Sequence, residues 1–252
     1  MTVEKLHVKE ARLKQLQSQI NPHFFYNCFS FITSMAKLRN HEAVVAMAHN
    51  LSKYYRYTTR QERDLVPLSD EVEFVQYYLK IQQMRMPRLT FSIVITSQAN
   101  SLLVPPLVAQ PLVENAVLHG IEPQAEDGII RIMTERVGSY MCLIVDDNGL
   151  GLSGDAITSL TLALDKPVEE KSGYGLWNVH QRMRLHFGED AGLDFSLSPL
   201  GGLRVILKWP LSTEEEQENG LIESSSNSNV VKMEGSDGSD LTVSQPQLWK
   251  AL

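Results

Sequence analysis

An apolar run that ends in an Asp-Asn-Gly-Leu-Gly cluster constrains this chain more than any other feature. The run covers residues 140–145, reads as a buried strand, and is followed by Asp147, Gly149 and Gly151. Glycines directly after a strand let the backbone turn tightly and let a ligand approach the main chain without a Cβ in the way. An aspartate at the same place can accept a hydrogen bond from the amino group of a base. The stretch therefore predicts that a ligand binds where this strand ends.

A second glycine cluster opens a predicted helix farther along the chain. Gly173 and Gly175 introduce an amphipathic run over residues 176–187. A helix N-terminus presents unpaired N–H groups and the positive end of the helix dipole, which favours a phosphate. Either glycine cluster alone is more often an ordinary turn. Because the Rossmann and P-loop glycine patterns are absent, the two clusters together suggest another kind of nucleotide site, with adenine at one end and phosphates at the other.

Two adjacent polar residues, Glu114 and Asn115, interrupt an otherwise apolar predicted helix over residues 107–119. Buried polar groups need hydrogen-bonding partners, and the simplest alternative is that these two cap or pair with neighbouring backbone. However, the Asn115 carbonyl suits Mg²⁺, which prefers few protein oxygens together with phosphate and water. Glu114 can accept a proton, and His119, one turn farther on, can donate to a phosphate.

Composition indicates a soluble globular protein with more than one part. Apolar residues make up 43% and charged residues 21% of the chain, which is ordinary for this class. The net charge of −7 divides into +5 for residues 1–97, −6 for residues 98–211 and −6 for residues 212–252, and this asymmetry favours two domains over one. The basic part has no Lys/Arg block, so no nucleic-acid surface is expected.

No apolar run reaches the ~18 residues of a membrane span and no signal-peptide pattern is found. Cys28 and Cys142 are expected to be buried free thiols in a reducing compartment.

Helical periodicity predicts an N-terminal hairpin. Residues 3–37 have helical apolar spacing with a kink at Pro22, and residues 41–60 form a second helix after a short turn. Two antiparallel helices with a short connection form a hairpin. Its wide apolar face implies a partner hairpin, and hence a dimeric four-helix arrangement.

The rest of the chain predicts an α+β sandwich with a mixed, largely antiparallel sheet. Leu68 to Met86 reads as a helix with Ser69 as its N-cap. From residue 212 the chain is acidic and poor in apolar residues, which predicts a disordered tail. The predicted domains are residues 1–65, 66–211 and 212–252. The predicted strands cover residues 89–96, 128–137, 140–146, 193–198 and 203–209.

Four segments together resemble a known family. Residues 114–120, 147–151 and 173–178 resemble, in this order, the N, G1 and G2 boxes of the GHKL (Bergerat) ATP-binding domain shared by histidine kinases, gyrase, Hsp90 and MutL. Residues 19–27, Gln-Ile-Asn-Pro-His-Phe-Phe-Tyr-Asn, resemble the phosphoacceptor segment of LytS/YesM-type sensor histidine kinases. The resemblance covers about residues 10–210. Leu203 departs from it, since a threonine is common at that place.

The resemblance implies roles for individual residues. His23 would accept the γ-phosphoryl group of ATP, a transfer to nitrogen that requires a neutral imidazole. Asn27, four residues on, shares its helix face and could fix the tautomer of the ring. Phe24 stands where many histidine kinases have an acidic base, so Glu114 is the candidate catalytic base. The implied ATP-binding residues are Asn115 (also the Mg²⁺ ligand), His119, Asp147 (for the adenine amino group), Gly149, Gly151, Gly173, Gly175, Leu176 and Asn178.

The expected function is that of the cytoplasmic region of a bacterial two-component sensor histidine kinase. It would be a homodimer that uses ATP and Mg²⁺, autophosphorylates on His23, and passes the phosphoryl group to an aspartate in the receiver domain of a response regulator. In this family, sensing and plasma-membrane segments precede such a region, so we expect membrane attachment only through segments missing here. Two alternatives stay open: a GHKL ATPase, and a nucleotide-binding dimerisation scaffold without kinase activity.

Overall fold

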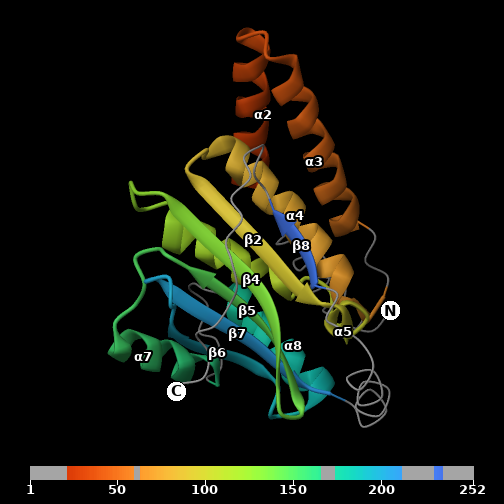
Figure 1. Ribbon diagram of the computed structural model, residues 1–252, viewed down its shortest axis with the longest axis vertical. Coiled ribbons are helices and arrows are strands. Elements are labelled where there is room, and N and C mark those ends of the chain that lie inside the picture. Colours follow the sequence, from red (N-terminus) through yellow and green to blue (C-terminus); the bar gives the residue numbers. More distant parts are fainter. Residues whose placement is uncertain (1–21, 60–62, 166–173, 212–229, 235–252) are drawn as a thin grey trace, which may run out of the picture.

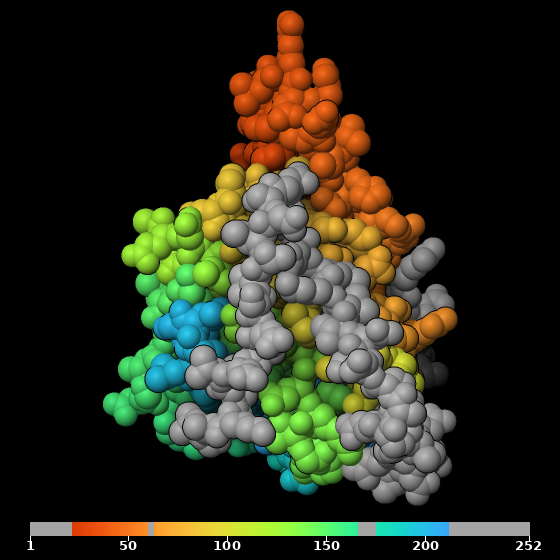
Figure 2. Space-filling model, viewed as in Figure 1, coloured from red at the N-terminus to blue at the C-terminus, as the bar shows by residue number. Residues whose placement is uncertain are grey.

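The computed structural model describes residues 22–59, 63–165, 174–211 and 230–234. In it a helical hairpin rises from an α/β body (Figures 1 and 2). The predicted helix before Pro22, with its kink, lies outside the described residues, as does most of the predicted tail. None of the described helices combines the length and the apolar character that crossing a membrane would require.

The hairpin consists of α2 (Pro22–Lys37) and α3 (His41–Thr59), as predicted. Arg39 takes a left-handed φ of 57° in the turn, and the Asn40 side chain accepts a hydrogen bond from the Ala43 N–H at 3.0 Å, which caps α3. The inner face of the hairpin is apolar and buried because its residues recur at helical spacing. Its members are Phe24, Cys28, Met47, Leu51 and Tyr54.

A six-stranded sheet forms the body, in the order β6-β7-β5-β4-β2-β8. Only β2 and β4 are parallel, so the prediction of a mixed, largely antiparallel sheet is confirmed. Residues along β2 and β7 alternate between buried and half-exposed, as expected when one face of a sheet packs on helices. The strands are β2 (Leu89–Thr96), β4 (Gly128–Val137), β5 (Tyr140–Asp147), β6 (Gly192–Leu197), β7 (Leu203–Pro210) and β8 (Val230–Glu234).

Helices pack on this sheet and complete an α+β sandwich (Figure 1). A short antiparallel ladder pairs β1 (Val66–Pro67) with β3 (Leu103–Val104). It joins the residues before the helix that begins at Leu68 to the residues before the helix that begins at Ala109. Both cysteines are buried free thiols, as predicted. The helices are α4 (Leu68–Arg85), α5 (Ser97–Asn100), α6 (Ala109–Asn115), the π-helix η1 (Ala116–Ile121), α7 (Gly154–Leu164) and α8 (Tyr174–Phe187).

Two local predictions need correction. Helix α4 begins at Leu68, without a side-chain cap, so the assignment of Ser69 as its N-cap is wrong. The reason is that strand β1 runs directly into the helix and the Leu68 N–H donates to the Leu102 carbonyl at 2.8 Å. Within the predicted tail, Val230–Glu234 form strand β8 against β2. The valines favour a strand, and β2 would otherwise be an open sheet edge. The domain boundaries at 65/66 and 211/212 stay predictions.

Candidate functional site

Asp147, the last residue of β5, is 2% exposed. Its Oδ1 atom accepts hydrogen bonds from the N–H groups of Gly149 (2.8 Å) and Leu203 (3.2 Å). The bond from position 203 comes from the backbone N–H, so it does not require a particular side chain there. Among the described residues none donates to Oδ2, which leaves this oxygen as an acceptor for a ligand amino group. Burial raises the pKa of the Asp147 carboxyl, and the neighbouring Asp146 charge adds to this to a smaller extent.

Three glycines close around this carboxylate. A Cβ at Gly202 would lie 2.0 Å from Asp147 Oδ1, and a Cβ at Gly120 would lie 3.0 Å from the same atom. At Gly149 a Cβ would lie 2.3 Å from the Cα of Gly120. At Gly202 and Gly149 a Cβ would also lie 2.5 Å and 2.3 Å from backbone atoms, so only glycine fits at these two positions. Gly202 was missed by sequence reasoning, and its signal was the Gly201-Gly202 pair in the turn between β6 and β7.

The two neighbours of Asp147 have structural roles. Asp146 forms a bidentate ion pair with Arg204 on β7, at 2.7 and 2.8 Å. Asn148 Oδ1 accepts the Ile129 N–H at 2.6 Å, and its Nδ2 donates to the Asp127 carbonyl at 2.8 Å. These side chains lock the strand end in place, whereas Asp147 retains an acceptor.

The N-box residues lie where α6 changes into the π-helix η1. Asn115 ends α6, and both it and Glu114 are half-buried, while His119 is exposed on η1. Short π segments inside helices occur often at functional sites. The Leu150 N–H donates to the Gly120 carbonyl at 3.3 Å, so the structure joins the end of the N box to the G1 loop. The Asn115 amide fits a Mg²⁺ ion held by one protein oxygen together with phosphate and water.

The start of α8 lies beside the N-box helix. A Cβ at Gly175, in the first turn of α8, would lie 3.5 Å from the Pro111 Cβ. Leu176 is half-buried and packs against the core, whereas Asn178 is exposed. Gly151 has a φ of 62°, which favours glycine. The structure therefore brings the N, G1 and G2 segments together, and Gly173 lies outside the described residues.

A fully buried carboxylate, Glu71 of α4, caps the other end of the N-box helix. It accepts the N–H groups of Leu107 (2.6 Å), Val108 (2.8 Å) and Ala109 (2.9 Å). Burial raises the pKa of the Glu71 carboxyl, while the hydrogen bonds that it accepts act in the opposite direction. Sequence reasoning missed this role, because an acid in the first turn of a helix is ordinarily explained by that helix's own dipole.

His23 lies exposed in the first turn of α2. The Asn27 amide nitrogen lies 3.3 Å from its Nδ1 atom, so the prediction that the two share a helix face is confirmed. His23 and Asn27 line a small crevice of about 20 Å³ together with Arg85 of α4 and Glu114 of α6. The structure thus brings the predicted phosphoacceptor and the predicted base to one crevice. Asp147 is not among the residues that line it.

Comparisons with known proteins agree with this geometry. Residues 11–89 match the family model described as "Histidine kinase", and residues 106–213 match "Histidine kinase-, DNA gyrase B-, and HSP90-like ATPase". Sensor histidine kinase YesM of Bacillus subtilis (strain 168) is 35% identical over 84% of this chain and 36% of its own length. Sensor protein LytS of Staphylococcus haemolyticus (strain JCSC1435) is 32% identical over 77% of this chain and 33% of its own.

Solved structures align less closely. The ATP binding domain of PrrB from Mycobacterium tuberculosis aligns with a TM-score of 0.43 at 20% identity, over 61% of this chain and all of that one. The chain spans about a third of the length of the curated relatives named above. Residues 11–89 therefore belong to the histidine kinase family and residues 106–213 to the histidine kinase-, DNA gyrase B-, and HSP90-like ATPase family, and the two together are similar to the YesM and LytS sensor histidine kinases.

Proposed function

We propose that this protein is a homodimeric kinase that transfers the γ-phosphoryl group of ATP to His23. The phosphoryl group then passes to an aspartate in the receiver domain of a response regulator. The observation that carries the proposal is the crevice that His23 shares with Glu114. Because Glu114 directly precedes the predicted Mg²⁺ ligand Asn115, the phosphoacceptor lies next to the N box.

The chain offers groups for each part of the nucleotide. Asp147 Oδ2 would accept the exocyclic amino group of adenine, while the glycines around it let the base approach the backbone. The first turn of α8, with Gly175, would face the phosphates. Asn115 would hold Mg²⁺, which supplies charge neutralisation on the phosphate oxygens.

The transfer needs a neutral imidazole and an acceptor for its proton. One nitrogen of the His23 ring forms a bond to the γ-phosphorus, the bond from that phosphorus to the oxygen shared with the β-phosphate breaks, and ADP leaves with the electron pair. The ring proton passes to Glu114. Asn27 orients the ring through its contact at Nδ1. Positioning and charge neutralisation supply most of the catalysis in reactions of this class.

The outer surface of the hairpin supports the homodimer. Tyr26 and Phe29 on α2 are 70% and 57% exposed, and Val45 on α3 is 67% exposed. A partner hairpin would cover these apolar side chains in a four-helix arrangement. We place this region in the cytoplasm, with the plasma-membrane attachment expected of full-length sensor histidine kinases.

Autophosphorylation with γ-labelled ATP tests the proposal, using the wild type, His23→Gln, Asn115→Ala and a control, His49→Gln, at another exposed hairpin histidine. We expect an acid-labile, alkali-stable label on the wild type and on His49→Gln, and none on the other two. Nucleotide binding without label would favour the scaffold. Phosphate release that survives His23→Gln would favour the ATPase, and either result would overturn the proposal.

A further inference from the structure

The turn before the N-box helix is a junction of several elements. Leu107 has a φ of 59°, which is unfavourable for a leucine, so neighbouring groups must hold the turn. Arg182 of α8 donates to the carbonyls of Pro106 (2.7 Å) and Leu107 (2.9 Å). Glu71 of α4 accepts the N–H groups that follow. The helix that carries Glu114 and Asn115 is therefore oriented by contacts from α4 and α8.

The phosphoacceptor hairpin reaches the same junction through two phenol groups of α3. Tyr57 donates its hydroxyl to Glu71 Oε1 at 2.5 Å. One turn earlier, the Tyr54 hydroxyl accepts a hydrogen bond from Gln110 Nε2 of α6 at 2.6 Å. Residues three apart share one helix face, so a single face of α3 contacts the first turn of α6 directly and through Glu71.

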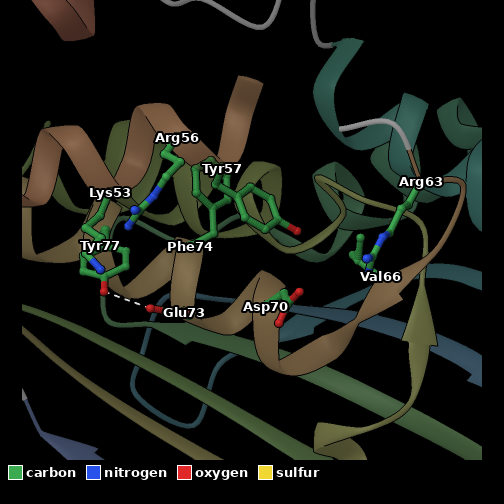
Figure 3. A pocket seen from close by; sticks show the side chains of 9 residues that line it. All are labelled: Lys53, Arg56, Tyr57, Arg63, Val66, Asp70, Glu73, Phe74 and Tyr77. Atoms are coloured by element: carbon green, nitrogen blue, oxygen red, sulfur yellow. Dashed lines mark hydrogen bonds between the residues drawn. The ribbon is translucent and has the colours of Figure 1, made fainter. Parts of the chain in front are cut away.

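Aromatic packing extends this contact to the phosphoacceptor segment. Phe24, which follows His23, packs on Tyr54 at a ring distance of 4.9 Å and stacks on Tyr78 of α4 at 5.6 Å. Tyr57 stacks on Phe74 at 4.4 Å with 20° between the ring planes. Both residues are labelled in Figure 3. The rings connect α2, α3 and α4 into one packed unit, and the two hydroxyl groups connect that unit to α6.

We propose that Tyr57, with Tyr54, is a positioning residue that sets the N-box helix relative to the phosphoacceptor helix through the Tyr57–Glu71 hydrogen bond. This inference rests on the proposed function. A shift of α3 would move the Glu71 carboxylate and, with it, the first turn of α6. Glu114 and Asn115, which lie one turn farther along, would then move as well. The nucleotide itself would still bind, because Asp147 and the glycines around it lie at the far end of η1.

Tyr77 is a matched control for Tyr57. Tyr57 and Tyr77 both line a hollow of about 670 Å³ between α3 and α4 (Figure 3). The Tyr77 hydroxyl donates to Glu73 Oε1 at 2.8 Å, so it too joins a tyrosine to a glutamate. Glu73, however, is exposed and lies on the same helix as Tyr77. Removing this hydroxyl removes a similar hydrogen bond without touching the junction.

The test compares Tyr57→Phe with Tyr77→Phe in the full chain. Phenylalanine keeps the ring and its stacking and removes only the hydroxyl. We expect Tyr57→Phe to lower the autophosphorylation kcat about tenfold, with the KM for ATP and the Kd of an unhydrolysable ATP analogue within about twofold of wild type. For Tyr77→Phe we expect all three values to stay within about twofold.

Hydrogen exchange at the Leu107, Val108 and Ala109 amides gives a readout that does not depend on phosphorylation. We expect faster exchange in Tyr57→Phe, by about threefold or more, and unchanged exchange in Tyr77→Phe. An unchanged kcat, or a loss of nucleotide affinity as large as the loss of kcat, would overturn the inference. If the wild type takes up no label, the proposed function fails, and the exchange rates alone decide: unchanged amides in Tyr57→Phe would then overturn the inference.

Discussion

Two buried carboxylates lie at the two ends of the segment formed by α6 and η1. Glu71 caps its beginning with both oxygens engaged by three backbone N–H groups and a phenol. Asp147 lies at its end beside Gly120, with Oδ1 engaged by two N–H groups and Oδ2 without a donor among the described residues. Both are shielded from water, so each needs hydrogen bonds from the groups around it to offset the lost hydration. A carboxylate whose two oxygens both accept hydrogen bonds from the protein orients the fold. A carboxylate with one oxygen that accepts no such bond can recognise a ligand.

Replacing Glu71 by alanine should have the largest effect on stability. The three N–H groups of residues 107–109 and the Tyr57 hydroxyl would lose their acceptor, and each unsatisfied buried group costs about 1–3 kcal/mol. We expect the free energy of unfolding in urea to fall by at least about 4 kcal/mol. Glu73→Ala, which removes an exposed carboxylate from the same helix, should change it by less than about 0.5 kcal/mol. Equal effects of the two substitutions would contradict the capping role of Glu71.

Replacing Asp147 by asparagine should remove ligand recognition and keep the fold. The amide oxygen can still accept the Gly149 and Leu203 N–H groups, but an amide nitrogen then meets the adenine amino group. We expect ATP affinity, measured by calorimetry, to fall about 100-fold, or about 2.7 kcal/mol. Asp146→Asn is the matched control. It should lower stability through its ion pair with Arg204 and leave ATP affinity within about threefold, and the reverse pattern would refute our assignment of the two aspartates.

A methyl group at Gly202 should disturb the same carboxylate indirectly. Its Cβ would lie 2.0 Å from Asp147 Oδ1, so the carboxylate or the β6–β7 turn must move. We expect Gly202→Ala to weaken ATP binding about tenfold, or about 1.4 kcal/mol. At Gly154 a Cβ has no atom within 4 Å, so Gly154→Ala should bind ATP like the wild type. If Gly202→Ala bound ATP as tightly as the wild type, ATP binding would not depend on the close approach of Gly202 to the Asp147 carboxylate.

The pH dependence of stability should show the smallest effect. Burial raises the pKa of Asp147 in the folded protein, so the folded state holds this proton more tightly than the unfolded state does. The resulting stabilisation is present below the unfolded-state pKa and is lost as pH rises through the folded-state pKa. Asp147→Asn does not titrate at this position, so its stability relative to wild type should be higher at pH 7.5 than at pH 4. Urea unfolding at both values measures this, and a difference of opposite sign would exclude a raised pKa.

Local patterns in the sequence predicted most of the elements but not the contacts between distant ones. The alternation over 89–96 and the helical spacing over 41–60 gave strand β2 and helix α3 because burial of one face decides both. The capping role of Glu71 could not be predicted, because nothing local in the sequence indicates that its partners are the amides of residues 107–109. Gly202 was missed for the same reason, since its need for glycine comes from Asp147 on another strand.

Locating the phosphoryl group by mass spectrometry, at neutral pH and with electron-transfer fragmentation, tests the central claim most directly. After incubation with Mg-ATP, trypsin releases the peptide of residues 15–37, in which His23 is the single histidine. We predict that this peptide carries the phosphoryl group, that the modified residue is His23, and that Asp147→Asn removes the modification. A phosphoryl group on His41 or His49 instead, or an unmodified chain that still hydrolyses ATP, would contradict the account.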